Sequence, residues 1–154
     1  MADAIDSSII VAAVAQDEDH HSECLKLLHI GNCMARTHAL SETFSTLTGG
    51  RLPERFGAAE VAQALQETVI PRIRVFDLTV AQLLGAMQEA ELRGVRGGAI
   101  YDYLYLVSAR LRNALRLFTL NVRHFRAFWR PGDPEIVHPR DATKLQPPEQ
   151  SGAS

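Results

Sequence analysis

Cysteine, lysine and long apolar runs are all scarce in this chain of 154 residues. Its two cysteines, Cys24 and Cys33, are too few for a disulfide framework, and no C-x-x-C pair indicates a zinc site, so we expect two buried, reduced thiols. No apolar run is long enough to cross a bilayer, and no basic segment precedes an apolar stretch at the N-terminus as in a secretory signal. These absences argue against a disulfide-rich secreted domain and a membrane-spanning protein, and they favour a cytoplasmic protein without a membrane partner.

The rest of the composition predicts a globular domain followed by a polar tail. Apolar residues make up 46% of the sequence and charged residues 22%, which suits a single domain with its own core. After Arg140 the chain reads DATKLQPPEQSGAS, a polar segment whose Pro, Gly and Ser content is typical of disorder. We therefore expect one domain over residues 1–140 and a disordered tail over 141–154.

Extended and helical patterns alternate along the predicted domain. Strands are expected at 3–5, 33–36, 72–78, 115–120 and 134–139. Most of the intervening segments have apolar residues at helical spacing, beginning around Ser8, and further helices are expected at 17–31, 37–50, 58–70, 79–94, 97–112 and 121–132. This alternation predicts an α/β fold, a three-layer α/β/α sandwich around a mostly parallel central sheet. Ligands of such sheets bind at the carboxyl ends of the strands.

Asp6 lies where the first expected strand ends, inside the otherwise apolar segment AIDSSIIVAAV. A charge in such a segment is costly unless another group pairs with it. One interpretation is a helix N-cap, because the short side chains of Asp-Ser-Ser accept hydrogen bonds from free backbone N–H groups. The other is a metal ligand at the end of a buried strand. The segment alone leaves both open.

Three more polar residues occupy comparable places. Glu42 follows the strand 33–36, on a helix whose apolar stripe is expected to be Leu40, Phe44 and Leu47. Asp102 lies in the first turns of the helix after Gly97-Gly98, and Asn121 comes directly after the strand 115–120. Each also has a structural interpretation: a solvated residue for Glu42, an acid favoured by the helix dipole for Asp102, and a helix cap for Asn121.

Charge is unevenly distributed, although the net charge is only −2. Six acidic residues precede the first basic residue, Lys26, whereas the span from Arg93 to Arg130 holds eight arginines and a single acid, Asp102. Arginine binds pairs of phosphate oxygens well. The asymmetry is therefore compatible with a phosphate-bearing partner, and equally with ordinary solvated helix faces.

Four segments, taken together, resemble the PIN-domain ribonucleases in their order and spacing, and in particular the VapC-like toxins of toxin–antitoxin pairs. These segments are IDSSIIVAAV, SETF, GGAIYDYLYLVSAR and LFTLNVRHF. The resemblance covers residues 3 to about 138. It implies that Asp6, Glu42 and Asp102 occupy the first three acidic positions of a site that binds Mg²⁺ or Mn²⁺ and cleaves RNA. Thr119 falls on a small hydroxyl position, and Asn121 falls on the fourth acidic position, which is most often aspartate. The substitution removes one charge from the metal site.

Other interpretations remain open at this point. A PIN-like fold with weakened catalysis would bind RNA or protein without cutting, and Asn121 motivates that alternative. A histidine-based nuclease would use one of six histidines, but no pair sits at a zinc-like helical spacing with a third ligand in view. A receiver-like phosphoacceptor domain needs a lysine near its acids, and the chain has only Lys26 and Lys144.

Partners are expected as well. The toxin resemblance implies a cognate antitoxin protein besides the RNA substrate. A homodimer is expected from the apolar stripes of two helices, Leu83, Leu84 and Met87 on the first, and Leu104, Val107 and Leu111 on the second.

Overall fold

A computed structural model describes residues 2–50 and 52–145 of the chain. Its centre is a five-stranded sheet in the order β3-β2-β1-β4-β5, and every neighbouring pair of strands is parallel. The strands are β1 (Asp3–Ile5), β2 (Cys33–Arg36), β3 (Ile73–Phe76), β4 (Arg116–Phe118) and β5 (Glu135–Val137). The predicted α/β fold with a parallel central sheet is confirmed.

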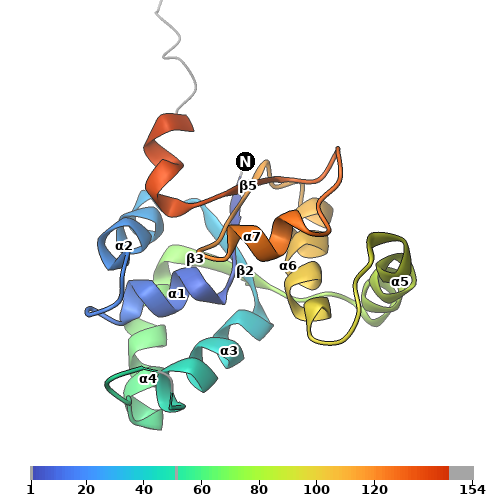
Figure 1. Cartoon of the computed structure of the whole chain (residues 1–154). Coiled ribbons are helices and arrows are strands. Elements are labelled where there is room, and N and C mark those ends of the chain that lie inside the picture. The colour runs from blue at the N-terminus through green and yellow to red at the C-terminus, as the bar shows by residue number, and fades with distance from the viewer. Residues whose placement is uncertain (1, 51, 146–154) are drawn as a thin grey trace, which may run out of the picture.

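Helices join the strands and cover the sheet. They are α1 (Ser7–Val14), α2 (His21–Ile30), α3 (Thr37–Thr48), α4 (Ala58–Ala64), α5 (Val80–Ala90), α6 (Ala99–Leu111) and α7 (Val122–Arg126). Figure 1 shows α1, α2, α3 and α4 grouped on one side of the molecule, and α5 and α6 on the other. The helices between β1 and β3 contact one another, with α1 against both α2 and α3, whereas α6 packs against α5, α7, β1 and β4.

The core follows from the parallel sheet, because its middle strands are covered on both faces. All four residues of β2 are buried. The largest fully buried side chains include Ile9 and Ile10 of α1, Tyr103 of α6, and Phe118 of β4. Both cysteines are buried and free, as expected, and burial raises the pKa of each thiol to about 12.

Several predicted boundaries were too wide. The strand expected at 72–78 spans only Ile73–Phe76, and the one at 115–120 only Arg116–Phe118. The helix expected at 58–70 is divided into α4, a π-helical turn η1 (Leu65–Val69) and a 3₁₀ turn η2 (Ile70–Arg72). Pro71 lies in that last turn, where its missing N–H group prevents a regular helix from continuing.

Residues 141–145 correct the expected start of the tail. They belong to the 3₁₀ helix η4 (Pro139–Leu145), and Ala142 packs against the main core. This apolar contact holds Ala142 against the domain. Residues 146–154 of the expected tail lie outside the described residues.

The apolar stripes also differ in part from expectation. In α6, Leu104 and Val107 are buried in the core and only Leu111 is exposed. In α5, Leu84 and Met87 are exposed, while Leu83 packs against the core. Two of the six residues assigned to a dimer surface are therefore core residues.

The 3₁₀ turn η3 (Glu91–Arg93) follows α5. No helix in the described part of the chain is both long and apolar enough to span a membrane.

Candidate active site

Asp6 lies directly after β1 and is the N-cap residue of α1. Its side chain is only 2% exposed, and both of its oxygens accept hydrogen bonds. Oδ1 accepts from the backbone N–H of Ser8 at 3.0 Å and from the Ser8 hydroxyl at 2.5 Å, and Oδ2 accepts from the Thr119 hydroxyl at 2.6 Å. The cap predicted from Asp-Ser-Ser is thus present, and the capping carboxylate is at the same time buried at the carboxyl end of a central strand.

The two hydroxyls that hold Asp6 are themselves held by the segment after β4. Ser8 Oγ accepts a hydrogen bond from the N–H of Leu120 at 2.9 Å, and Thr119 Oγ1 accepts one from the N–H of Asn121 at 2.9 Å. Each hydroxyl must therefore direct its own proton toward Asp6. Oδ1 takes two hydrogen bonds and Oδ2 one, and a carboxylate oxygen has two lone pairs. Oδ2 consequently keeps one lone pair for another ligand.

Asp102 lies in the first turns of α6, as expected, after Gly97 and Gly98. Gly97 has a φ of +58°, a left-handed conformation that favours glycine. The Asp102 side chain is about one-third exposed, and its Oδ2 lies 3.5 Å from Nδ1 of His124 on α7. Beside it is a hollow of about 480 Å³ whose lining includes Gly98, Asp102 and His124. Solvent and ligands can therefore reach this carboxylate, which is more exposed than that of Asp6.

Glu42 is held from two sides on α3. The Ser7 hydroxyl donates to its Oε2 at 2.8 Å, and Nε2 of His38, one turn earlier, lies 2.7 Å from its Oε1.

The apolar stripe expected for α3 was wrong in part: Phe44 is 41% exposed, while Ala39, Thr43 and Leu47 are buried.

Asn121 occupies the N-cap position of α7, but its side chain makes no capping hydrogen bond there. The cap interpretation of this residue is therefore not what the structure shows. Its side chain is exposed, and its backbone N–H is the group that donates to Thr119. The amide is free to act at the adjoining surface.

The carboxylates are close enough to disturb one another. Burial raises the pKa of Asp6 to about 6, and the charge of Asp102 adds to that increase. Burial also raises the pKa of Asp102; there the neighbouring His124 opposes the change and the charge of Glu42 reinforces it. Asp102 thus interacts with both other acids.

These acids form a hard, oxygen-only donor set that suits a divalent cation, which would relieve their mutual repulsion. Within residues 2–50 and 52–145, no three His, Cys, Asp or Glu side chains converge closely enough to form a complete metal cluster by themselves. The fit therefore requires part of the coordination to come from water, as is usual for Mg²⁺.

Comparison with known families identifies the family of this chain. The PIN-domain model matches residues 4–128, most of the chain and all of the residues described above. The chain belongs to the PIN-domain family. Among the curated protein sequences that were compared, none matches it.

Solved structures share the PIN fold of this chain at low sequence identity. VapC20 from Mycobacterium tuberculosis, a sarcin–ricin loop cleaving toxin, is 16% identical with a TM-score of 0.66, covering 86% of this chain and 100% of that one. VapBC2 from Rickettsia felis, bound to promoter DNA, is 20% identical with a TM-score of 0.63 (90% and 98%). FitAcB from Neisseria gonorrhoeae is 16% identical with a TM-score of 0.59 (90% and 98%).

Sequence reasoning named Thr119, which donates to Asp6, but it overlooked the histidines beside the other two acids of this PIN domain. His38 could have been found, because a spacing of four residues places it beside Glu42 on one helix face. His124 carried no such signal, since 22 positions separate it from Asp102. A further overlooked residue is Arg36 at the end of β2, whose guanidinium is buried over the Tyr105 ring at 5.9 Å. Its Nε and Nη1 have no hydrogen-bond partner among the described residues.

Proposed function

We propose that this PIN-domain chain is a metal-dependent endoribonuclease and the toxin of a toxin–antitoxin pair. The observation that carries the proposal is the buried Asp6 carboxylate, fixed by three hydrogen bonds at the carboxyl edge of the sheet and within electrostatic reach of Asp102. A buried acid of this kind is costly to a fold, and its retention next to a second acid favours a role in binding a cation.

Asp6, Asp102 and Glu42 would hold Mg²⁺ or Mn²⁺, and Asn121 would contribute a neutral oxygen. When bound, such an ion supplies Lewis acidity and lowers the pKa of a bound water that can attack a phosphodiester. The products expected from attack by water carry 5′-phosphate and 3′-hydroxyl ends.

The chain's own residues prepare this site before any substrate arrives. Ser8 and Thr119 orient Asp6 so that a lone pair of Oδ2 stays free. Ser7 holds Glu42 from the start of α1. Because these hydroxyls are fixed by backbone N–H groups or by short contacts between elements, the carboxylates need little rearrangement to bind a cation, which is the basis of preorganised catalysis.

The proposed partners rest on the similar solved structures. VapC20 cleaves the sarcin–ricin loop, which supports RNA as the substrate. VapBC2 and FitAB were solved bound to DNA, which supports a DNA-binding antitoxin as the cognate partner of this chain. Exposed Leu84, Met87 and Leu111 support a homodimer. For such a protein we propose a cytoplasmic location.

A second candidate is a catalytically weak PIN domain that binds RNA or protein, and Asn121 is the observation that favours it. Replacing a carboxylate by an amide removes one charge from the cation site. Judged by the pKa shifts that a neighbouring charge causes, this is worth about 1–3 kcal/mol, or roughly ten- to a hundredfold in metal affinity or rate.

The two candidates are separated by a cleavage assay on a panel of labelled RNAs with Mg²⁺ and Mn²⁺ titrations. Asp6→Ala serves as the blank. We expect the wild type to cut above that blank, and Asn121→Asp to cut about ten- to a hundredfold faster or at lower metal concentration. Cleavage by Asn121→Asp alone would favour the weak PIN domain, and cleavage by neither would contradict the nuclease assignment.

Metal binding is measured separately by calorimetry. Mn²⁺ should bind the wild type, and Asp6→Asn or Asp102→Asn should weaken that binding at least tenfold, because each removes one of the charged ligands. Equal binding by the wild type and both variants would rule out this metal site while leaving the fold assignment intact.

A further inference from the structure

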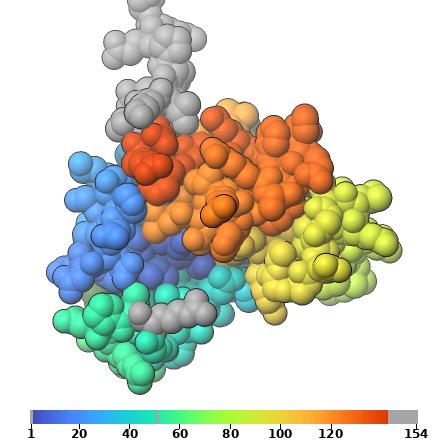
Figure 2. Space-filling model, in the orientation of Figure 1, coloured from blue at the N-terminus to red at the C-terminus, as the bar shows by residue number. Residues whose placement is uncertain are grey.

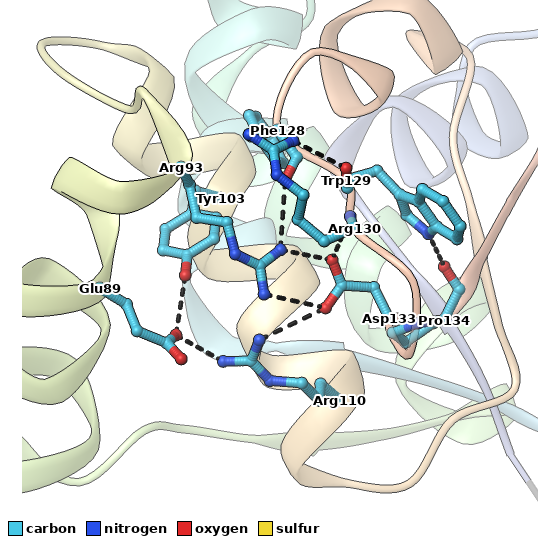
Figure 3. Close-up of polar contacts among 9 residues, drawn as sticks. All are labelled: Glu89, Arg93, Tyr103, Arg110, Phe128, Trp129, Arg130, Asp133 and Pro134. Atoms are coloured by element: carbon cyan, nitrogen blue, oxygen red, sulfur yellow. Dashed lines mark hydrogen bonds and ion pairs between the residues drawn. The ribbon is translucent and has the colours of Figure 1, made fainter.

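The arginines of the basic half of the chain fall into two groups. Members of the first group are committed to the fold. Arg93 and Arg110 both pair with the buried carboxylate of Asp133, and Arg110 also pairs with Glu89 at 2.6 Å. Figure 3 shows the two guanidinium groups converging on Asp133 from different elements, α6 and the turn after α5. These arginines hold elements together and are not available to a ligand.

Arg123 and Arg126, like Arg96 after α5, belong to the second group. Both lie on α7, three residues apart and therefore on neighbouring positions of one helix side, and both are exposed. Neither makes an ion pair or a hydrogen bond with any described residue. Two unpaired positive charges on one short helix are a marked contrast to the paired arginines a few residues away.

These two arginines line a groove of about 850 Å³ formed by α7, β5 and η4, which we call the α7 groove. Figure 2 shows α7 and η4 exposed on the same face of the molecule. Two acids also line the groove, Glu135 and Asp141, and Asp141 is paired with Arg140 of the groove at 3.8 Å. With three arginines against two acids, the groove keeps an excess of one positive charge.

The α7 groove is continuous with the candidate active site. Asn121 and His124 line one part of it, and His124 is the residue whose ring lies 3.5 Å from Asp102. A strand with one phosphodiester at the acids would place its neighbouring phosphates along this adjoining surface. Arginine forks bind phosphate oxygens in pairs and tolerate any base sequence.

We propose that the α7 groove binds the backbone of single-stranded RNA on one side of the cleavage site, with Arg123 and Arg126 as its phosphate contacts. The proposal rests on the proposed nuclease function, which places one phosphodiester of the strand at the acids. Binding of RNA to the α7 groove can nevertheless be measured without cleavage. An acidic protein segment is the competing occupant, and the experiment includes it.

The binding test uses the whole chain, a fluorescein-labelled 12-nucleotide RNA and excess EDTA, with fluorescence anisotropy measured over a range of KCl concentrations. Each phosphate contact in single-stranded nucleic acid contributes about 0.7 to the slope of log K against log salt. Arg123→Gln and Arg126→Gln should each reduce the slope by about 0.7, and the double variant by about 1.4 with roughly tenfold weaker binding at low salt.

Arg74→Gln is the matched control. It removes one exposed arginine charge from β3, the strand at the opposite edge of the sheet from β5, and should leave the slope unchanged. Thermal melting of every variant checks that the fold is retained. An unchanged slope in the double variant, or an equal loss in Arg74→Gln, would overturn the proposal. So would tighter binding of a fluorescent poly-glutamate peptide that depends on the same two arginines.

The cleavage assay distinguishes this proposal from the function it builds on. If RNA binding depends on the two arginines but no cleavage occurs with any metal, only the nuclease function fails. If the double variant cleaves RNA with an unchanged KM, only the proposal that the α7 groove binds RNA fails. Support for both requires a raised KM, about tenfold, with kcat largely retained.

Discussion

Neutralising Asp6 should stabilise the metal-free protein, which is the reverse of what replacing a capping residue usually does. The perturbation is Asp6→Asn, measured in EDTA. Asn keeps an oxygen at the position of Oδ1, so both hydrogen bonds from Ser8 can persist. Its amide nitrogen meets the Thr119 hydroxyl in place of Oδ2, and that hydroxyl loses its acceptor. The variant thus removes a buried charge at the expense of one hydrogen bond.

The size of the effect follows from the pKa of Asp6, which burial raises from 3.8 to about 6. One pKa unit corresponds to 1.36 kcal/mol, so the charged form costs about 3 kcal/mol of folding free energy at neutral pH. The lost hydrogen bond offsets about 1 kcal/mol of the gain. Asp6→Asn should therefore be about 2 kcal/mol more stable than the wild type, and its melting temperature about 5 °C higher.

The raised pKa of Asp6 also determines how the predicted difference in stability depends on pH. Because the folded state binds the Asp6 proton more tightly than the unfolded state does, the cost is absent below about pH 4. It grows as the pH rises through the folded pKa and is complete above about pH 7. The difference in stability between Asp6→Asn and the wild type should follow the same course, changing sign from a small loss in acid to a gain at neutral pH.

Urea unfolding in EDTA at several pH values between about 4 and 8 measures this difference, with far-UV circular dichroism as the signal. Thr119→Val is a useful control, because it removes one hydrogen bond to Asp6 but keeps the charge, and it should be destabilised at neutral pH. A variant Asp6→Asn that is less stable than the wild type at every pH, or a difference that does not vary with pH, would refute the reasoning. Asp6 would then act as a cap alone.

Three other predictions concern separate parts of the molecule. Asp102→Asn in EDTA should melt at or above the wild-type temperature, since burial raises the pKa of Asp102; a clear loss would show that its contact with His124 dominates. Asp133→Asn should lose about 3 kcal/mol at pH 7 by urea unfolding, because Arg93 loses its charged partner and Arg110 keeps only Glu89. Although burial opposes its charge, hydrogen bonding to Arg93 lowers the pKa of Asp133, so this loss should shrink in acid. Light scattering at micromolar concentration should give a dimer mass that Leu84→Glu reduces to a monomer mass, and a monomeric wild type would contradict the homodimer.

The sequence by itself determined the class of fold and the position of its main acids. Strands and helices alternate with clear stop signals, and a parallel sheet is the arrangement in which such units bury their apolar residues. Asp6 could be placed at the carboxyl edge because it directly follows β1. A threonine before the apolar pattern of residues 79–94 is typical of an N-cap, and the structure shows a complete capping box at Thr79 of α5. Each of these features depends on residues close together in the chain.

Only the tertiary structure decided which polar groups act together. The hydrogen bond from Thr119 to Asp6 joins residues 113 positions apart, and the contact of His124 with Asp102 joins two elements that meet only in the folded chain. The same is true of the arginines, since composition cannot separate Arg93, which Asp133 neutralises, from Arg123, which remains free among the described residues. The physical reason is that pairing between distant charges depends on where packing places them, whereas helical and strand periodicity depends on neighbours along the chain.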